Sequence, residues 1–336
     1  MNSQKIGADL VTAFKRFPET AAERQRIISQ IQINGQHIND AGWLQVDTVT
    51  RFHAPDGLRV IIYPDSHSPF EHPGVLRAIF DFAEWYGPHL AFDVGDFMEF
   101  GELSRFPKNA KEGRPYDMAA GAESGQRQLR AKMKAGRPAL LVVTPGNHDD
   151  RERRYLSDVA PLFGNLVNSN NHNRLSDLAT NILNFSAADP IMFCWGTGQT
   201  GGKDGGLMLQ DYRIRHGNMV DSKPAYSAYK HLLKALDNIG IGHVHRAGNV
   251  VFETSEGLVK HAEEFGCTIN WDAPGFNYVG PDHDWTHSFG VAEVYNGIVH
   301  VQVIPALIGE DEHGHRREYF TYLDSQFNIV EFPVYE

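Results

Sequence analysis

Residues 58–67 read Leu-Arg-Val-Ile-Ile-Tyr-Pro-Asp-Ser-His, and this stretch decides the fold that the sequence predicts. Its apolar, β-branched first half is typical of a strand buried on both faces, and a proline marks where that strand ends. Two similar apolar runs follow at 90–94 and 139–143, with helical periodicity between the three runs over 73–86 and 118–135. Strand and helix therefore alternate. This order predicts an α/β protein with a parallel sheet and right-handed crossovers.

The second half of the chain is expected to add strands and one helix around this unit. The predicted strands are 207–215, 291–294 and 298–304, and the predicted helix is 227–236. The segment 239–245 holds Gly242-His243-Val244-His245. The last two strands flank Asn296-Gly297, a favoured two-residue hairpin turn, so we expect them to pair.

The first fifty residues have a different pattern from the rest. Apolar residues recur at helical spacing over 6–14 and 21–31, and Thr20 is placed to cap the second helix. Such a segment could form a small DNA-binding appendage, pack on the main domain, or link to a partner. The predicted divisions are a helical N-terminal extension at 1–50 and one domain at 51–336, with a cap or insertion at about 150–205.

The composition excludes collagen-like, coiled-coil, disulfide-scaffold and disordered proteins. Apolar types make up 41% of the 336 residues and charged types 22%, close to the average for globular proteins. Only two cysteines occur, too few for a disulfide framework. No apolar run approaches the ~18 residues of a membrane span, and no secretory apolar segment follows the first residues. We expect a cytoplasmic protein without a membrane partner, and the sequence leaves its oligomeric state open.

The formal net charge of −11 argues against binding of nucleic acid through the protein surface alone. A nucleic-acid substrate stays possible because bound divalent cations can become the largest local charges in a site. Basic residues that could add to such a grip gather at Lys15-Arg16, Arg24 with Arg26, 108–114, and Arg151 with Arg153 and Arg154. Binding through these groups would weaken steeply with salt.

Metal-ligand residue types follow the predicted strands, each beside a glycine or proline. They are Asp65 and His67, Asp96, Asn147 with His148, His216, and His243 with His245. The carboxyl ends of strands in an open α/β sheet are where ligands bind, so we expect these side chains to converge. A lone Asp-x-His or Gly-Asp is common, and a lone buried histidine is usually a hydrogen-bonded core residue. Together and in this order, they predict a metal site.

The same blocks resemble the signature of the calcineurin-like metallophosphoesterase superfamily. The blocks are Asp65-x-His67, Gly95-Asp96, Gly146-Asn147-His148-Asp149, His216-Gly217 and Gly242-His243-x-His245. The resemblance implies a four-layer αββα sandwich, with two mixed sheets packed face to face between helices. It also implies two metal ions, the first held by Asp65, His67 and His245 and the second by Asn147, His216 and His243. Asp96 would bridge them, and His148 would be a catalytic histidine that is not a ligand.

These assignments predict a phosphoesterase that uses two divalent ions. The mixed oxygen and imidazole donors suit Mn²⁺, our first expectation, and also Fe, Zn²⁺ or Ni²⁺. A hydroxide held between the ions would attack phosphorus in line, and His148 would act as general acid or stabilise the transition state. Glu99 could orient His148, or it could be a solvated loop acid. Protein phosphatases of the superfamily carry an arginine where this chain has Phe100, and this difference favours a phosphodiester of nucleic acid (DNA or RNA) or a nucleotide as substrate.

Two alternatives and three further contacts complete the sequence-based hypothesis. The protein could instead hydrolyse phosphomonoesters of a small metabolite or phosphoprotein, or it could be a metal-bearing binding module without catalysis. Arg105, His172 and His287 are candidate phosphate contacts. The last of them lies in the polar, aromatic-bearing segment 280–287, which resembles phage members of the superfamily.

Overall fold

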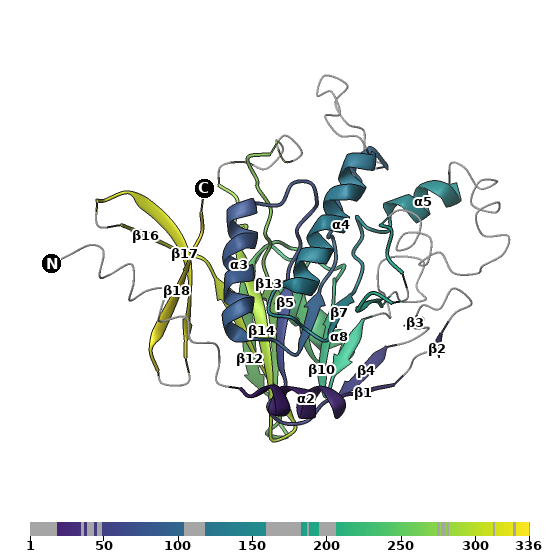
Figure 1. Ribbon diagram of the computed structural model, residues 1–336, viewed down its shortest axis with the longest axis vertical. Coiled ribbons are helices and arrows are strands. Elements are labelled where there is room, and N and C mark those ends of the chain that lie inside the picture. The colour runs from purple at the N-terminus through teal and green to yellow at the C-terminus, as the bar shows by residue number, and fades with distance from the viewer. Residues whose placement is uncertain are drawn as a thin grey trace.

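A computed structural model of the chain contains two large sheets, a small third sheet and helices on their outer faces (Figure 1). The structure describes residues 19–34, 37–38, 44–45, 49–103, 118–158, 183–186, 188–194, 206–273, 276, 280, 282–311, 313–324 and 327–335. The predicted helix 6–14 lies outside these residues. Two short strands, β2 (His37–Ile38) and β3 (Leu44–Gln45), pair with each other.

The six-stranded sheet has the order β15-β14-β5-β6-β7-β8 and contains the predicted parallel unit. Its bounds are β5 Arg59–Tyr63, β6 Leu90–Asp93, β7 Leu140–Val143, β8 Ile191–Phe193, β14 Ser288–Tyr295 and β15 Ile298–Pro305. Strands β5 to β8 are parallel, whereas β14 pairs antiparallel with both β5 and β15. The crossovers are α3 (Pro73–Tyr86) and α4 (Met118–Lys134), as the periodicity predicts. The expected hairpin is also confirmed, with Asn296 and Gly297 both at positive φ.

The seven-stranded sheet has the order β1-β4-β9-β10-β11-β13-β12. Its bounds are β1 Gln32–Asn34, β4 Thr50–His53, β9 Leu207–Leu209, β10 Tyr212–Arg215, β11 Asn238–Ile241, β12 Ala247–Glu253 and β13 Val259–Phe265. The prediction of one strand over 207–215 is wrong, because β9 and β10 form an antiparallel hairpin. Gln210 turns the chain at φ 54°. Apolar residues are buried on both sides of this turn, so the sequence pattern runs through it without a break.

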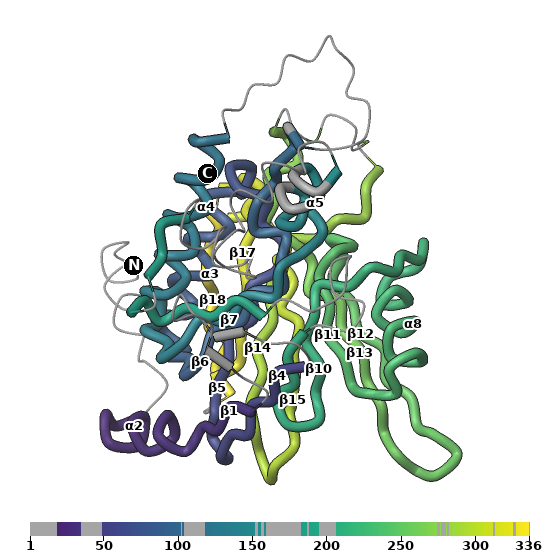
Figure 2. Tube along the Cα trace, turned by 90° about the vertical axis from the view of Figure 1, so that its right-hand side faces the viewer, coloured from purple at the N-terminus to yellow at the C-terminus, as the bar shows by residue number. Residues whose placement is uncertain are grey.

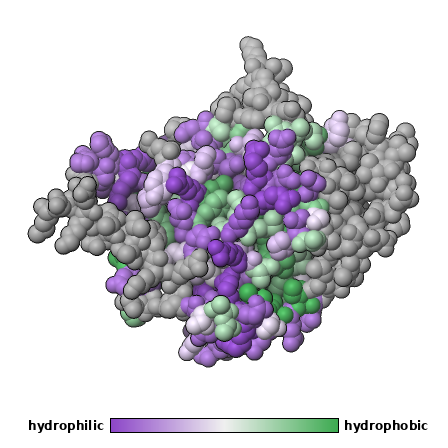
Figure 3. All heavy atoms as spheres, in the orientation of Figure 1, coloured by the Kyte–Doolittle hydropathy of each residue, from purple (hydrophilic) through white to green (hydrophobic). Residues whose placement is uncertain are grey.

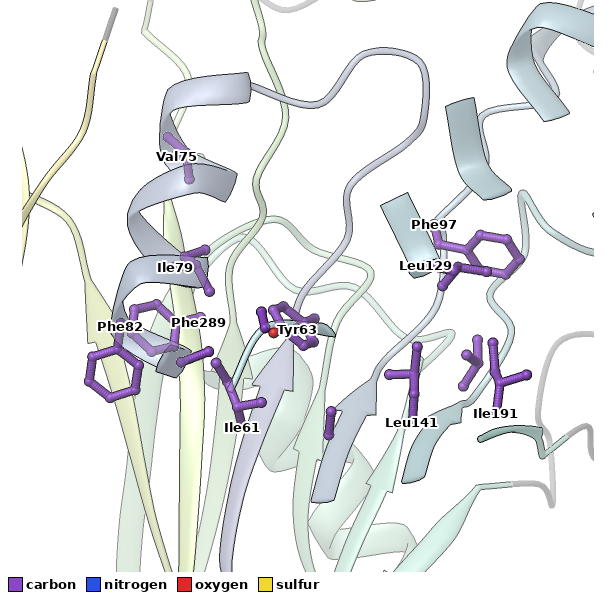
Figure 4. Packing of buried hydrophobic residues seen from close by; sticks show 14 of the residues in the cluster. Ile61, Tyr63, Val75, Ile79, Phe82, Phe97, Leu129, Leu141, Ile191 and Phe289 are labelled. Atoms are coloured by element: carbon purple, nitrogen blue, oxygen red, sulfur yellow. The ribbon is translucent and has the colours of Figure 1, made fainter. Parts of the chain in front are cut away.

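Buried side chains show that the two sheets pack face to face. The layer between them includes Ile62, Phe92 and Val142 from one sheet and Phe52, Ile214 and Phe265 from the other. The outer face of the six-stranded sheet packs against α3 and α4, and Phe82 of α3 is fully buried there (Figure 4). Burying such a side chain contributes ~1.5–3 kcal/mol. Helix α8 (Tyr226–Ala235) covers the outer face of the other sheet, on β11 and β13 (Figure 2). The predicted four-layer αββα architecture is therefore present.

The C-terminal residues add a three-stranded sheet of β16 (Leu307–Glu310), β17 (Arg316–Leu323) and β18 (Ile329–Pro333). This sheet lies beside α3 (Figure 1), where Tyr322 and Phe332 contact Phe82 and Trp85 through their rings. Most of the described surface on the face drawn in Figure 3 is hydrophilic, with smaller apolar areas between. Among the described residues, no helix has the length and apolar character needed to cross a membrane.

The described part of the N-terminal segment packs on the main domain. Helix α2 (Ala21–Ser29) forms as predicted, and Thr20 and Glu23 make a reciprocal capping box at its start. Arg24 donates hydrogen bonds to the carbonyls of Gly87, Pro88 and Arg137 at 2.6–2.9 Å. These carbonyls directly precede β6 and β7, so α2 lies at the amino ends of the parallel strands. Strand β1, also within the first fifty residues, joins the seven-stranded sheet.

Candidate metal centre

Five strand ends bring the predicted metal ligands together at one edge of the sandwich. The six-stranded sheet supplies Asp65 and His67 after β5, Asp96 after β6, and Asn147 and His148 after β7. The seven-stranded sheet supplies His216 after β10, and His243 and His245 after β11. All of these residues lie beyond the carboxyl ends of their strands, which is the edge opposite α2.

The first group of ligand atoms belongs to Asp65, His67 and His245, all of them buried. Nε2 of His245 lies 3.2 Å from Oδ2 of Asp65 and 3.2 Å from Nε2 of His67. The second group belongs to Asp96, His216 and His243.

In the second group, Nε2 of His216 is the central atom. It lies 3.1 Å from Oδ2 of Asp96, 3.2 Å from Nδ1 of His243 and 3.1 Å from Oδ1 of Asn147. Asp96 lies between the two groups, because its Oδ2 is also 3.7 Å from Nε2 of His67.

Two observations indicate that these groups could hold metal ions. Oδ1 of Asp65 is buried and has no hydrogen-bond partner, although buried polar atoms normally have one. Two pairs of imidazole nitrogens also face each other at 3.2 Å, the pair of His67 with His245 and the pair of His216 with His243. A neutral imidazole carries one proton, so the facing nitrogens of both rings carry lone pairs when each proton lies on the other ring nitrogen. A cation would satisfy the orphaned oxygen and the facing lone pairs together.

The backbone at these residues is strained. His67, Asp96, His243 and His245 have φ of 50°, 47°, 71° and 60°, in the left-handed region that non-glycine residues rarely adopt. Each such residue costs about 1–3 kcal/mol and persists only where surrounding structure enforces it, as at functional sites.

Two glycines of the motifs are required for close approach. A Cβ added at Gly146 would collide with Oδ1 of Asp96, and one at Gly242 would collide with Oδ1 of Asp65. The glycines in the Gly-Asn-His and Gly-His-x-His blocks therefore let the backbone pass directly behind the two carboxylates.

Burial and mutual charge set the protonation of the site. Burial raises the pKa of Asp65 to about 7 and lowers the pKa of both His243 and His245 to about 3. Burial also opposes charge on His216, but Asp96 and Asp65 outweigh it and raise the pKa of His216 to about 9. In return, His216 is the chief neighbour that holds the pKa of Asp96 well below its usual value, against the opposing effect of burial. A bound cation would favour ionised carboxylates and neutral imidazoles, the forms that ligate metals.

Glu99 links His67 to His148. Its Oε2 lies 2.6 Å from Nδ1 of His67 and 2.8 Å from Nδ1 of His148, and only 16% of its side chain is exposed. Burial opposes charge on Glu99, but His148 and then His67 hold its pKa well below its usual value. A carboxylate behind a metal-ligating histidine fixes the ring orientation and the tautomer. Glu99 is therefore a hydrogen-bonded residue of the site and not a solvated loop acid.

Sequence analysis did not assign two residues that the structure places here. Arg151, the first residue of α5 (Arg151–Asp158), donates to the carbonyl and to Oε1 of Glu99 at 2.7 and 3.0 Å. Asp149 accepts from the backbone N–H groups of Met98 and Gly146 at 2.9 and 2.7 Å, and thereby ties two of the loops together. A basic cluster and a motif acid were the only sequence signals for them, and neither specifies a partner.

Of the three predicted phosphate contacts, His287 lies among the described residues. Arg105 and His172 lie outside the residues that the structure describes. His287 is buried, and its ring nitrogens contact Oε1 of Glu318 at 2.8 Å and the carbonyl of Ile269 at 2.9 Å. Both of its hydrogen-bonding atoms are thus engaged within the protein.

Comparison with known proteins gives distant similarities. No family model matches the chain. It is 24% identical over 258 residues to the Gene 54 protein of Mycobacterium phage D29, covering 75% of this chain and 94% of that protein. The Gene 54 protein of Mycobacterium phage L5 is 24% identical over 257 residues, with the same coverage. Both are phage proteins, in agreement with the predicted phage-type branch.

Two solved structures are also similar at low identity. Vps29 from Chaetomium thermophilum has 11% identity and a TM-score of 0.38, over 84% of this chain and 100% of that one. A Vps29 single mutant from Entamoeba histolytica has 10% identity and a TM-score of 0.33, over 82% and 99% of the two chains. The assignment of the fold rests on the sheet order and layers described above.

Proposed function

We propose that this protein is a divalent-metal-dependent phosphoesterase that hydrolyses phosphodiesters of nucleic acid or nucleotides. The observation that carries the proposal is the pair of largely buried Asp/His groups that meet at Asp96, next to the His148–Glu99 pair. A purely structural metal site needs neither an additional histidine nor an open position. We place the protein in the cytoplasm, in keeping with its two free, buried cysteines.

The ligand roles follow the two groups. Asp65, His67 and His245 would hold one cation, Asn147, His216 and His243 the other, and Asp96 both. When bound, two divalent ions supply positive charge to the phosphoryl oxygens and lower the pKa of the attacking water. The donors suit Mn²⁺ first, and Fe, Zn²⁺ or Ni²⁺ as alternatives.

His148 is assigned the proton transfer. With Nδ1 engaged by Glu99, its ring turns Nε2 toward the cluster, 4.0 Å from Oδ2 of Asp96. Its side chain is 16% exposed, so a substrate atom can reach it. We assign to Nε2 the proton that is given to the leaving oxygen, a step worth typically ~10²–10⁴-fold in rate. Glu99 would orient the ring.

The test compares bis-p-nitrophenyl phosphate with p-nitrophenyl phosphate, on protein stripped by a chelator and then reloaded with Mn²⁺. We expect metal-dependent hydrolysis with a preference for the diester. Asp96→Ala should lose bound metal and turnover together, whereas His148→Ala should keep the metal and lose ~10²–10⁴-fold in rate. His300→Ala, on an exposed position of β15, is the matched control and should change neither. Undiminished metal in Asp96→Ala would contradict the ligand assignment.

The same assay separates the alternatives. Faster hydrolysis of the monoester would favour a phosphatase that acts on a metabolite or phosphoprotein. Bound metal without hydrolysis of either compound would favour a binding module.

Polynucleotide and nucleotide substrates differ in their dependence on salt. The described Arg24 is held at the opposite edge and Arg154 is paired with Asp150, whereas Arg151 at the start of α5 lies next to His148. A polynucleotide would use basic residues near the site, and its affinity would fall steeply with salt. A gel-shift titration with His148→Ala at two salt concentrations measures this. Absence of retardation at low salt contradicts the polynucleotide and leaves a nucleotide.

A further inference from the structure

Arg151 is held in a defined geometry beside the proposed proton donor. Its Nη1 donates to the carbonyl oxygen of Glu99 at 2.7 Å and to Oε1 at 3.0 Å. Its Nη2 lies 2.8 Å from Nε2 of His148. The side chains of Arg151, Glu99 and His148 are each 16% exposed, so all three are largely buried but reach the solvent side of the site.

This geometry leaves one half of the guanidinium directed at the reacting group. The two bonds to Glu99 anchor Nη1, whereas Nη2 has its contact with the ring nitrogen that we assign to the leaving oxygen. Any substrate oxygen that hydrogen-bonds to Nε2 of His148 must therefore lie close to Nη2. A guanidinium presents several N–H donors in a rigid plane, and this arrangement suits two oxygens of one phosphate group.

The positive charge of Arg151 favours an anion at this position and opposes the repulsion from the neighbouring carboxylates. The site is lined by the carboxylates of Asp65, Asp96 and Glu99, and Arg151 carries a permanent positive charge within hydrogen-bond distance of the last of them. In the structure Nη2 donates to the unprotonated Nε2 of His148. Once Nε2 takes up a proton from solvent, a phosphate ester entering the site would replace this contact with two charge-assisted bonds, one from each side chain.

We propose that Arg151 binds the phosphoryl group of the substrate, with Nη1 fixed on Glu99 and Nη2 donating to a non-bridging oxygen. This proposal rests on the proposed phosphoesterase function and names a substrate-binding residue for it. The competing explanation is that Arg151 only positions Glu99 and His148. A positioning residue would influence turnover without contributing to the affinity for a free phosphate ion, and this difference is measurable.

The experiment is calorimetric titration of inorganic phosphate into the full-length, Mn²⁺-loaded protein and its variants. Arg151→Ala should bind phosphate roughly 10- to 100-fold more weakly, the range for a lost hydrogen bond to a charged group. Arg151→Lys should recover part of the affinity, because it retains the charge but not the planar fork. The matched control is Arg154→Ala, on the same helix, where Nε of the arginine pairs with Asp150 at 2.7 Å. It should bind phosphate as the wild type does.

The outcomes are distinguishable from failure of the proposed function. Phosphate affinity in Arg151→Ala equal to that of Arg154→Ala overturns the proposal, whatever happens to turnover. A wild type that binds phosphate but hydrolyses neither aryl phosphate rejects the enzyme, while the phosphate titrations still decide the role of Arg151. Metal content and thermal unfolding are measured for each variant. If Arg151→Ala does not fold, the same comparison uses Arg151→Met and Arg151→Lys.

Discussion

Replacing the buried Lys132 with methionine tests whether its ion pair with Asp93 supports the loops of the candidate metal site. Lys132 of α4 and Asp93 at the end of β6 are both fully buried, with Nζ 2.7 Å from Oδ2. The same Nζ lies 3.3 Å from Oγ of Ser66, between Asp65 and His67 in the chain. This ion pair therefore fixes the ends of two strands that carry proposed ligands.

The size of the effect follows from desolvation. Burial already raises the pKa of Asp93, and Lys132 is the neighbour that chiefly offsets it. Removing Lys132 leaves a buried carboxylate without its countercharge, which costs about 3–5 kcal/mol in the free energy of unfolding. The double variant Lys132→Met/Asp93→Asn removes both charges and should recover most of this loss, because replacing a whole buried pair is often neutral.

The assay is urea unfolding at pH 7, repeated at pH 5. Without Lys132 the folded-state pKa of Asp93 lies still further above its unfolded value, so the folded state takes up a proton first as the pH falls. The deficit of Lys132→Met should therefore shrink at pH 5. The control is Arg127→Met on the same helix, whose pair with Glu123 at 3.8 Å is exposed and worth about 0.3–0.5 kcal/mol. Equal losses in Lys132→Met and Arg127→Met would refute the reasoning.

Two further predictions concern the site and the N-terminal anchor. Gly242→Ala should weaken metal binding about 10- to 100-fold, because the added Cβ collides with Asp65. In the control variant Gly121→Ala the added Cβ meets no other atom, so this variant should keep its metal. Equal metal contents of the two variants by elemental analysis would contradict this prediction. Burial, followed by the charge of Arg59, lowers the pKa of His89 to about 4, so the unfolded chain binds the proton first and stability should fall from pH 6.5 to 4. His89→Gln should remove up to about 3 kcal/mol of that loss. A pH slope in denaturant unfolding identical to that of the wild type would reject the assignment.

The sequence predicts elements best where local pattern and tertiary burial agree. Helix 73–86 has an apolar stripe, a proline in its first turn and a glycine after its end, and the structure reproduces its bounds. The hairpin 207–215 shows the opposite case. Its turn at Gln210 carries no glycine or proline, and burial on both sides makes two strands look like one. The packing of two sheets into four layers came from the resemblance, because periodicity does not determine which strands share a sheet.

In the candidate site, too, some features could be predicted from the sequence and others could not. The ligand-type residues can be predicted from the sequence because each follows a strand, and the carboxyl ends of strands converge. The partners of Arg151 are not readable, because they depend on how α5 starts after the turn at His148. The same limit applies to His287, whose ring is engaged by the C-terminal sheet through Glu318, far along the chain. A motif therefore names the residues of this site more reliably than it names their neighbours.

The backbone strain at the ligand-type residues explains why the candidate site is built on buried strands. Four ligand-type residues in the left-handed region cost about 4–12 kcal/mol together, at about 1–3 kcal/mol each. A whole domain has a net stability of only about 5–15 kcal/mol, so the loops could not hold this geometry alone. The surrounding structure imposes this geometry through strands buried on both faces, the Lys132–Asp93 ion pair and the hydrogen bonds that Asp149 accepts from the backbone. An ion that binds the folded state alone returns stability, about 2.7 kcal/mol when present at 100 times its Kd. The strained loops would therefore make the folded site and the proposed metals interdependent, and a loss of metal should alter the same residues to which we assign the chemistry.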